Sequence, residues 1–188
     1  MCNLKERLEN YVRSNNIDLT YDWKGQNENQ VDICFFEWHQ RMTNANSEEE
    51  FREIIADIFR WGGVGSDRLK QHYAEKLHRH DTSFESVKNT PLASWTKILA
   101  AYDPERYWIY DSRVAIALKT LVHEYDWFIP RRRNDEVGAY FRCQYTNALT
   151  ATESYDRYLI LLSAVDVRAS SSLEKKLFML GGQITINV

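Results

Sequence analysis

Apolar side chains recur at intervals of three and four residues along most of this 188-residue chain. That spacing puts them on one face of an α-helix, so it predicts a fold made mostly of amphipathic helices. Residues that interrupt helices are scarce, with seven glycines and three prolines. We therefore predict a single helical domain over residues 1–188, with eight or nine helices at about 4–15, 31–42, 47–62, 66–77, 89–103, 111–125, 135–149, 152–167 and 171–180.

Local signals mark several helix ends. Ser47 and Glu50 have the S-x-x-E spacing of a capping box, in which each side chain accepts a hydrogen bond from a backbone N–H at the helix start. The glycines at 62–65 are typical of a helix stop. Gly181 and Gly182 predict the same for the last helix.

A few segments depart from the helical pattern. Residues 15–30 are polar and predict a loop or an extended arm. Residues 184–186 carry β-branched side chains and predict a short tail strand, which would pair with the arm near Leu19. Residues 81–87 predict a short helical turn. The expected fold class is thus mostly α, with room for one short strand pair.

Charge and cysteine content narrow the partners and the compartment. The chain has 24 basic and 27 acidic residues, a net charge of −3, so a nucleic-acid site requires a local basic patch. Residues 60–80 hold such an excess, with five basic against two acidic side chains. The three cysteines form no C-x-x-C pair, which predicts a protein of the reducing cytoplasm. The charged N-terminal residues and the lack of a long apolar run predict no signal peptide and no membrane span.

Widespread catalytic templates are absent from the sequence. It contains no H-E-x-x-H, P-loop, G-x-S-x-G or Rossmann glycine pattern. His78 and His80 stand two residues apart on a predicted helix and point in different directions, so they are poor ligands for one metal ion. We therefore expect no metal site and no cofactor.

The stretch richest in candidate chemistry covers residues 95–118. It predicts a helix, a turn at Asp103, an aromatic segment and a second helix that begins at Asp111. A carboxylate at that helix start faces a partial positive charge, which favours its ionised form. The residues alone favour a plain capping role for Asp111, in which the side chain accepts hydrogen bonds from the first N–H groups.

A resemblance adds a second interpretation of Asp111. Residues 109–118 read Ile-Tyr-Asp-Ser-Arg-Val-Ala-Ile-Ala-Leu, which resembles the aspartate-bearing motif, typically V-D-T-H-V-x-R-V, of helix-hairpin-helix DNA glycosylases. The preceding helix with Asp103 and Pro104 is similar to a divergent bacterial branch related to eight-oxoguanine DNA glycosylases. The resemblance implies a helix-hairpin-helix and aspartate region at 90–125, DNA binding and a part in base excision repair. It assigns Asp111 to the carboxylate that stabilises positive charge as the bond between base and sugar breaks.

The family's catalytic lysine has a less direct counterpart. In the family a Gly-hydrophobic-Gly turn precedes that lysine, whereas here Pro91-Leu92-Ala93-Ser94 occupies the neighbourhood. Lys97 is the nearest lysine upstream of Asp111 and is the candidate nucleophile. Its place inside a predicted helix is also consistent with a side chain that points to solvent.

Further candidates could contact DNA through amides, guanidinium groups or rings. The Gly63-Val64-Gly65 turn could bring backbone N–H groups to a phosphate, although it also fits a simple helix stop. Arginines beside aromatic rings could bind phosphates and stack on a base, although a triple arginine in a turn is equally common as solvated surface. The DNA-binding candidates are Gly63, Gly65, Arg113, Arg131, Arg132 and Arg133, and the base-stacking candidates are Trp61, Trp108 and Trp127.

The sequence therefore leaves three functions open. The first is hydrolysis of an N-glycosidic bond in DNA by a glycosylase-like protein. The second is a nucleic-acid-binding module that keeps this scaffold without catalysis. The third is a protein-interaction domain, which the net charge of −3 also allows.

Overall fold

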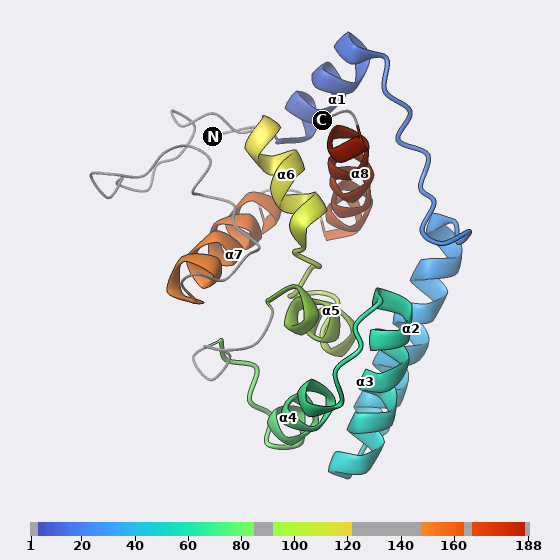
Figure 1. Cartoon of the computed structure of the whole chain (residues 1–188), viewed down its shortest axis with the longest axis vertical. Coiled ribbons are helices and arrows are strands. Elements are labelled where there is room, and N and C mark those ends of the chain that lie inside the picture. Colours follow the sequence, from blue (N-terminus) through green and yellow to red (C-terminus); the bar gives the residue numbers. More distant parts are fainter. Residues whose placement is uncertain (1–3, 85–91, 122–147, 164–166, 187–188) are drawn as a thin grey trace. The chain divides into compact units, whose positions relative to one another are not determined.

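The computed structural model describes residues 4–84, 92–121, 148–163 and 167–186 (Figure 1). The described residues form helices and loops with no strand, which confirms the mostly α prediction. The helices are α1 (Leu4–Asn15), α2 (Glu28–Asn44), α3 (Glu48–Gly62), α4 (Asp67–His78), α5 (Leu92–Tyr102), α6 (Ser112–Leu121), α7 (Ala148–Ser163) and α8 (Val167–Ile186).

The chain divides into two compact units. The central unit is Glu28–Ile109 and contains α2 to α5. The terminal unit combines Met1–Asn27 with Tyr110–Val188 and contains α1 and α6 to α8. None of the described helices combines the length and the apolar character needed to cross a membrane.

The core of the central unit is built on α3. Its capping box is present as predicted, since the Glu50 N–H donates to the Ser47 hydroxyl and the Ser47 N–H donates to the Glu50 carboxylate. Gly63 ends the helix in the left-handed conformation, with φ 73°, and donates its N–H to the Phe59 carbonyl. This confirms the predicted stop, because a side chain would be strained at that φ. The face with 3/4 spacing is buried: Phe51, Ile54, Ile55, Ile58 and Phe59.

Helices α4 and α5 complete that core. Ser66 caps α4 by accepting from the Leu69 N–H, as expected for a serine before the first helical residue. The Trp95 ring of α5 stacks on Tyr73 of α4 with centroids 4.8 Å apart. On α2, His39 Nδ1 lies 3.0 Å from the Tyr102 carbonyl oxygen, so the imidazole can satisfy the last turn of α5.

In the terminal unit α8 packs closely against α6 (Figure 1). A Cβ added to Gly181 would overlap the Arg113 carbonyl oxygen and lie 2.8 Å from the Arg113 Cα, so only glycine allows this approach. On α1, Arg7 donates to the Leu121 carbonyl at the end of α6. Helix α6 is therefore held near both of its ends by other parts of the same unit.

The prediction for the end of the chain is wrong. Helix α8 continues through Gly181 and Gly182 to Ile186, so the two glycines do not end it and residues 184–186 form no tail strand. The glycine at 181 serves close packing rather than chain reversal. The arm and α8 do meet, but through the Gln183 side-chain amide, which donates to the Asp18 carbonyl.

The predictions for the segments between helices have mixed outcomes. Residues 81–84 are not helical, and 85–87 lie outside the described residues. In residues 16–27 the backbone is a loop with an isolated bridge between Trp23 and Gln26, as predicted, but residues 28–30, also expected in the loop, form the start of α2. The predicted helix at 135–149 lies outside the described residues apart from its last two positions, where α7 begins.

Candidate functional site

Asp111 stands immediately before the first residue of α6. Its Oδ1 accepts hydrogen bonds from the Arg113 N–H at 3.0 Å and the Val114 N–H at 3.2 Å. Its carbonyl accepts from the Ala115 N–H at 2.9 Å, which starts the helical ladder. Asp111 is therefore the N-cap that its position in the sequence predicted. The residue is half-buried, so packed side chains do not seal it completely.

A cluster of tyrosines, here called the tyrosine cluster, adjoins Asp111 along the chain and in space. Tyr110 precedes Asp111, and Tyr155 and Tyr158 come from α7; all three are 0% exposed. The Tyr110 ring centroid lies 5.4 Å from that of Tyr158 and 6.0 Å from that of Tyr155. The candidate carboxylate thus borders a tightly packed aromatic core.

The Tyr158 hydroxyl gives this neighbourhood an unusual electrostatic character. Burial raises the pKa of Tyr158 well above 10.0, and the negative charge of Glu174 and then Tyr155 and Asp111 add to this effect. The hydroxyl is buried and has no hydrogen-bond partner among the described residues. It therefore stays a neutral phenol, and two carboxylates act on it, Asp111 just before α6 and Glu174 on α8.

Arg113 lies in the first turn of α6 beside the candidate carboxylate. Its guanidinium lies over two rings, 4.6 Å from the Phe178 centroid and 5.1 Å from the Trp23 centroid. These cation–π contacts join α6, α8 and the arm. A role for Arg113 in DNA binding stays a prediction, and DNA would have to share the guanidinium with these rings.

Lys97 belongs to the central unit, whereas Asp111 belongs to the terminal unit. The Lys97 side chain is 7% exposed rather than solvent-facing, and its Nζ donates to the Ala93 carbonyl at 3.3 Å. Its methylene groups pack against Gly62, where an added Cβ would lie 3.0 Å from Lys97 Cδ. Its nucleophilic role stays a prediction.

The remaining DNA-binding and base-stacking candidates lie in varied surroundings. Gly63 caps α3, and Gly65 is exposed with nothing within 4 Å of an added Cβ. Trp61 packs edge-on against Phe35 and Trp38 of α2, while Trp108 is 7% exposed. The predicted base-stacking role of Trp108 would require this buried ring to move, whereas Trp61 is half-buried and its role stays a prediction. The remaining candidates, Trp127, Arg131, Arg132 and Arg133, lie outside the described residues.

The basic excess at residues 60–80 is largely paired. Arg60 contacts Asp57 at 3.0 Å, and Lys70 contacts Asp67 at 2.8 Å. Lys76 is buried rather than displayed on the surface. Both surface pairs join residues three apart on one helix, and Lys76 is withdrawn from the surface, so fewer of these charges are available to a polyanion than their count suggests.

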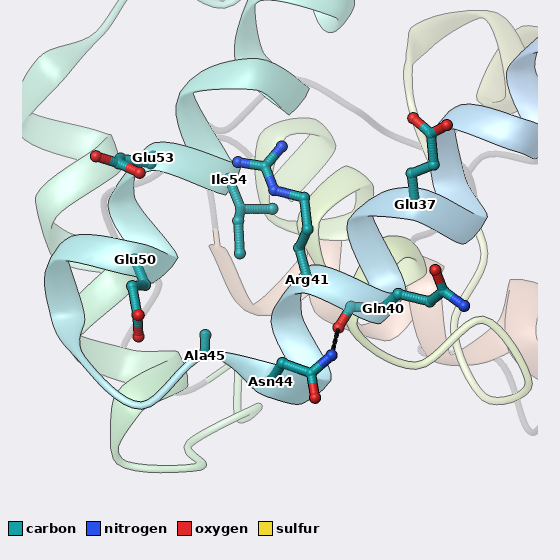
Figure 2. A pocket seen from close by; sticks show the side chains of 8 residues that line it. All are labelled: Glu37, Gln40, Arg41, Asn44, Ala45, Glu50, Glu53 and Ile54. Carbon is teal, nitrogen blue, oxygen red and sulfur yellow. Dashed lines mark hydrogen bonds between the residues drawn. The ribbon is translucent and has the colours of Figure 1, made fainter.

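An open hollow lies between α2 and α3 (Figure 2). Its volume is about 530 Å³. Charged and amide side chains predominate in its lining, which consists of Glu37, Gln40, Arg41, Asn44, Ala45, Glu50, Glu53 and Ile54. We call it the acidic hollow, because its lining carries three carboxylates and one guanidinium.

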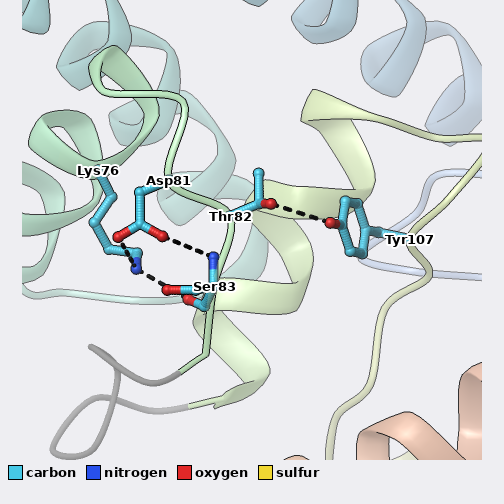
Figure 3. A network of polar contacts seen from close by, with 5 residues as sticks. All are labelled: Lys76, Asp81, Thr82, Ser83 and Tyr107. Carbon is cyan, nitrogen blue, oxygen red and sulfur yellow. Dashed lines mark hydrogen bonds and ion pairs between the residues drawn. The ribbon is translucent and has the colours of Figure 1, made fainter.

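A polar network holds the chain beyond α4 (Figure 3). Lys76 Nζ lies 2.9 Å from Asp81 Oδ2, donates to the Ser83 carbonyl and stands 5.2 Å from the Trp95 ring centroid. Burial opposes the charge of Asp81, but hydrogen bonds from Ser83 and Lys76 outweigh it and hold the pKa of Asp81 well below its usual value. The network gives the buried Lys76 ammonium its polar partners and holds the segment after α4 in place.

Sequence reasoning missed the chemistry of Tyr158 and Glu174. The apolar spacing of 152–167 included Tyr155, but nothing in that pattern indicates a phenol without a partner. Among the described residues no group of three or more His, Cys, Asp or Glu side chains is arranged to hold a metal ion.

Comparison of the chain with models of protein families, with curated proteins and with solved structures finds no match.

Proposed function

We propose that this chain binds DNA and hydrolyses the N-glycosidic bond of a damaged or modified base, with Asp111 as the catalytic carboxylate. The observation that carries the proposal is the half-buried position of Asp111 at the start of α6, where two backbone N–H groups hold its Oδ1. These donors fix the orientation of the carboxylate at the helix start, where the helix dipole places a partial positive charge. An ionised carboxylate stabilises an oxocarbenium-like transition state more than the neutral sugar that precedes it.

Hydrolysis by water requires no further reactant. The C1′–N bond breaks with its electron pair departing on the base, and the water oxygen forms a new bond to C1′. The water proton passes to Asp111 or to solvent. We favour water over Lys97 as the nucleophile, because a lysine must present an unprotonated amine to the sugar, whereas Lys97 is buried and donates to its own helix.

The experiment uses duplexes that each carry one oxidised, alkylated or deaminated base. Asp111→Asn removes the charge but keeps the cap, because asparagine caps helices about as well as aspartate. We expect base release to fall by about 100-fold or more, with little change in thermal stability. The matched control is Asp103→Asn, which alters a carboxylate that accepts the Arg106 N–H in the turn after α5. Equal activity of Asp111→Asn and the wild type would contradict the proposal.

The same preparation separates the two other open functions. Binding that weakens steeply with salt, without base release, would assign a non-catalytic nucleic-acid-binding module. No affinity for nucleic acid at low salt would leave a protein-interaction domain.

A further inference from the structure

The outer face of α2 exposes two large apolar side chains. Ile33 is 48% exposed and Phe36 is 60% exposed, and they stand three residues apart, within one helical turn. The opposite face of α2 buries Val31, Trp38 and Met42 in the core of the central unit. Because α2 already has a complete buried face, Ile33 and Phe36 are surplus to the packing of this helix. Residues three apart on a helix are neighbours on its surface, so these two side chains offer apolar contact to a partner.

The acidic hollow begins where this apolar pair ends. Glu37 follows Phe36 in the chain and lines the hollow together with Glu50 and Glu53 of α3 (Figure 2). The N–H groups of Asn46 and Ser47 donate to Glu50 and lower its pKa, so that this carboxylate stays ionised. The single cation of the lining, Arg41, is paired with Asp57 at 2.7 Å. The hollow therefore has negative charge to offer to a ligand.

We propose that Ile33, Phe36 and the acidic hollow form one docking surface for a basic amphipathic segment of a partner protein. An apolar side chain of that segment packs on Ile33 and Phe36. A lysine or arginine about one helical turn away, roughly 6 Å along α2, enters the hollow. Apolar contact supplies affinity, and the carboxylates select for positive charge.

Other occupants fit this surface less well. DNA presents phosphates, which the three carboxylates of the hollow repel. A second copy of the chain would meet the surface through a two-fold axis, and such an interface brings the same patch of both copies together. Acidic hollows would then face each other. A basic partner is the occupant whose charge complements the surface.

This surface is independent of the proposed glycosylase activity. Its residues belong to the central unit, and Asp111 belongs to the terminal unit. An inactive protein would leave the docking proposal untouched.

The experiment titrates the full chain against a fluorescent helical peptide with leucines on one face and lysines on the other. Fluorescence anisotropy measures the Kd. Phe36→Ser removes the apolar contact, and the double variant Glu37→Lys with Glu53→Lys reverses the charge of the hollow while leaving the capping residue Glu50 in place. We expect each to weaken binding by about tenfold or more. The matched control is Ile160→Ser on α7, a side chain 57% exposed in the other unit, for which we expect no change.

Four results would overturn the proposal. They are a wild type that does not bind the lysine peptide at low salt, equal binding of a peptide with glutamates in place of the lysines, unchanged binding by Phe36→Ser, and a dimer in sedimentation that Phe36→Ser dissociates. All of the substituted side chains are at the surface, and circular dichroism confirms that the variants are folded.

Discussion

Helices α3 and α6 begin with the same local device in different surroundings. At α3 the Ser47 hydroxyl and Glu50 carboxylate accept backbone N–H groups, with Glu50 exposed to solvent. At α6 the Asp111 carboxylate accepts two N–H groups but is half-buried beside three fully buried tyrosines. The two caps therefore share their hydrogen-bond geometry but not their surroundings. The difference lies in what packs against the cap.

The largest expected loss of stability follows from preventing α8 from approaching α6, because this removes the surroundings that distinguish the α6 cap from the α3 cap. We expect Gly181→Ala to cost more than about 3 kcal/mol of unfolding free energy, because its Cβ would overlap the Arg113 carbonyl oxygen. The neighbouring Gly182→Ala is the control. Its nearest heavy atoms, in the Arg113 guanidinium, lie 3.6 Å away, and alanine should stabilise this helix interior by up to about 1 kcal/mol. Urea denaturation measures both, and equal stability of the two variants would contradict the close approach.

Removing the cap of α3 or of α6 tests whether the surroundings of a cap change its contribution to stability. We expect Ser47→Ala to cost about 1 kcal/mol and Asp111→Ala about 2 kcal/mol, because the N–H groups of Arg113 and Val114 are less accessible to replacement water. Asp111→Asn should cost less than about 1 kcal/mol. Chemical denaturation of the three variants gives these values. Equal costs for the two alanine variants would mean that the surroundings of α6 do not matter to its cap.

A smaller change in stability is expected in the tyrosine cluster, where a substitution should leave the unfolding free energy unchanged or raise it. The Tyr158 hydroxyl has no hydrogen-bond partner among the described residues, so Tyr158→Phe removes an unsatisfied group without leaving a cavity. We expect the unfolding free energy to stay the same or to rise by up to about 1 kcal/mol. Thermal unfolding checks this. A clear loss of stability would show that the hydroxyl is hydrogen-bonded in solution.

The smallest effect is the pH dependence of the exposed cap at α3. Hydrogen bonds from Asn46 and Ser47 lower the pKa of Glu50 from its usual 4.5 in the folded state. Its contribution to stability is therefore present above that value and is lost as the pH falls through the lower, folded-state pKa. We expect the stability difference between the wild type and Glu50→Gln to shrink on acidification from about pH 6 to about pH 2. A difference independent of pH would contradict the charged capping box.

Most of the helix positions could be predicted because their signals are local. The apolar spacing of α3 and the cap at Ser47 act within a few residues of each other, and the structure confirms both. The assignment of Asp111 as a cap succeeded for the same reason. Gly181 failed as a local signal, because whether a glycine ends a helix or admits a neighbour depends on what packs against it.

The surroundings of the candidate site could not be predicted from local sequence patterns. The spacing of Lys97 in its helix allowed a side chain that points to solvent or to the interior. Its contact with Gly62 of α3 places it in the interior. Tyr158 and Glu174 reach the neighbourhood of Asp111 from helices far along the chain. Their effect on one another depends on distance and burial, neither of which periodicity encodes.

The sequence by itself determined the helical class, the caps at Ser47 and Asp111, and the stop at the glycines of residues 62–65. These features depend on hydrogen bonds and backbone preferences within one or two turns. Tertiary structure decided that α8 passes straight through its glycines, that Lys76 and Lys97 are buried, and that Asp111 borders buried phenols. Those outcomes depend on which distant surfaces meet and exclude water, and a one-dimensional pattern of residues does not specify that.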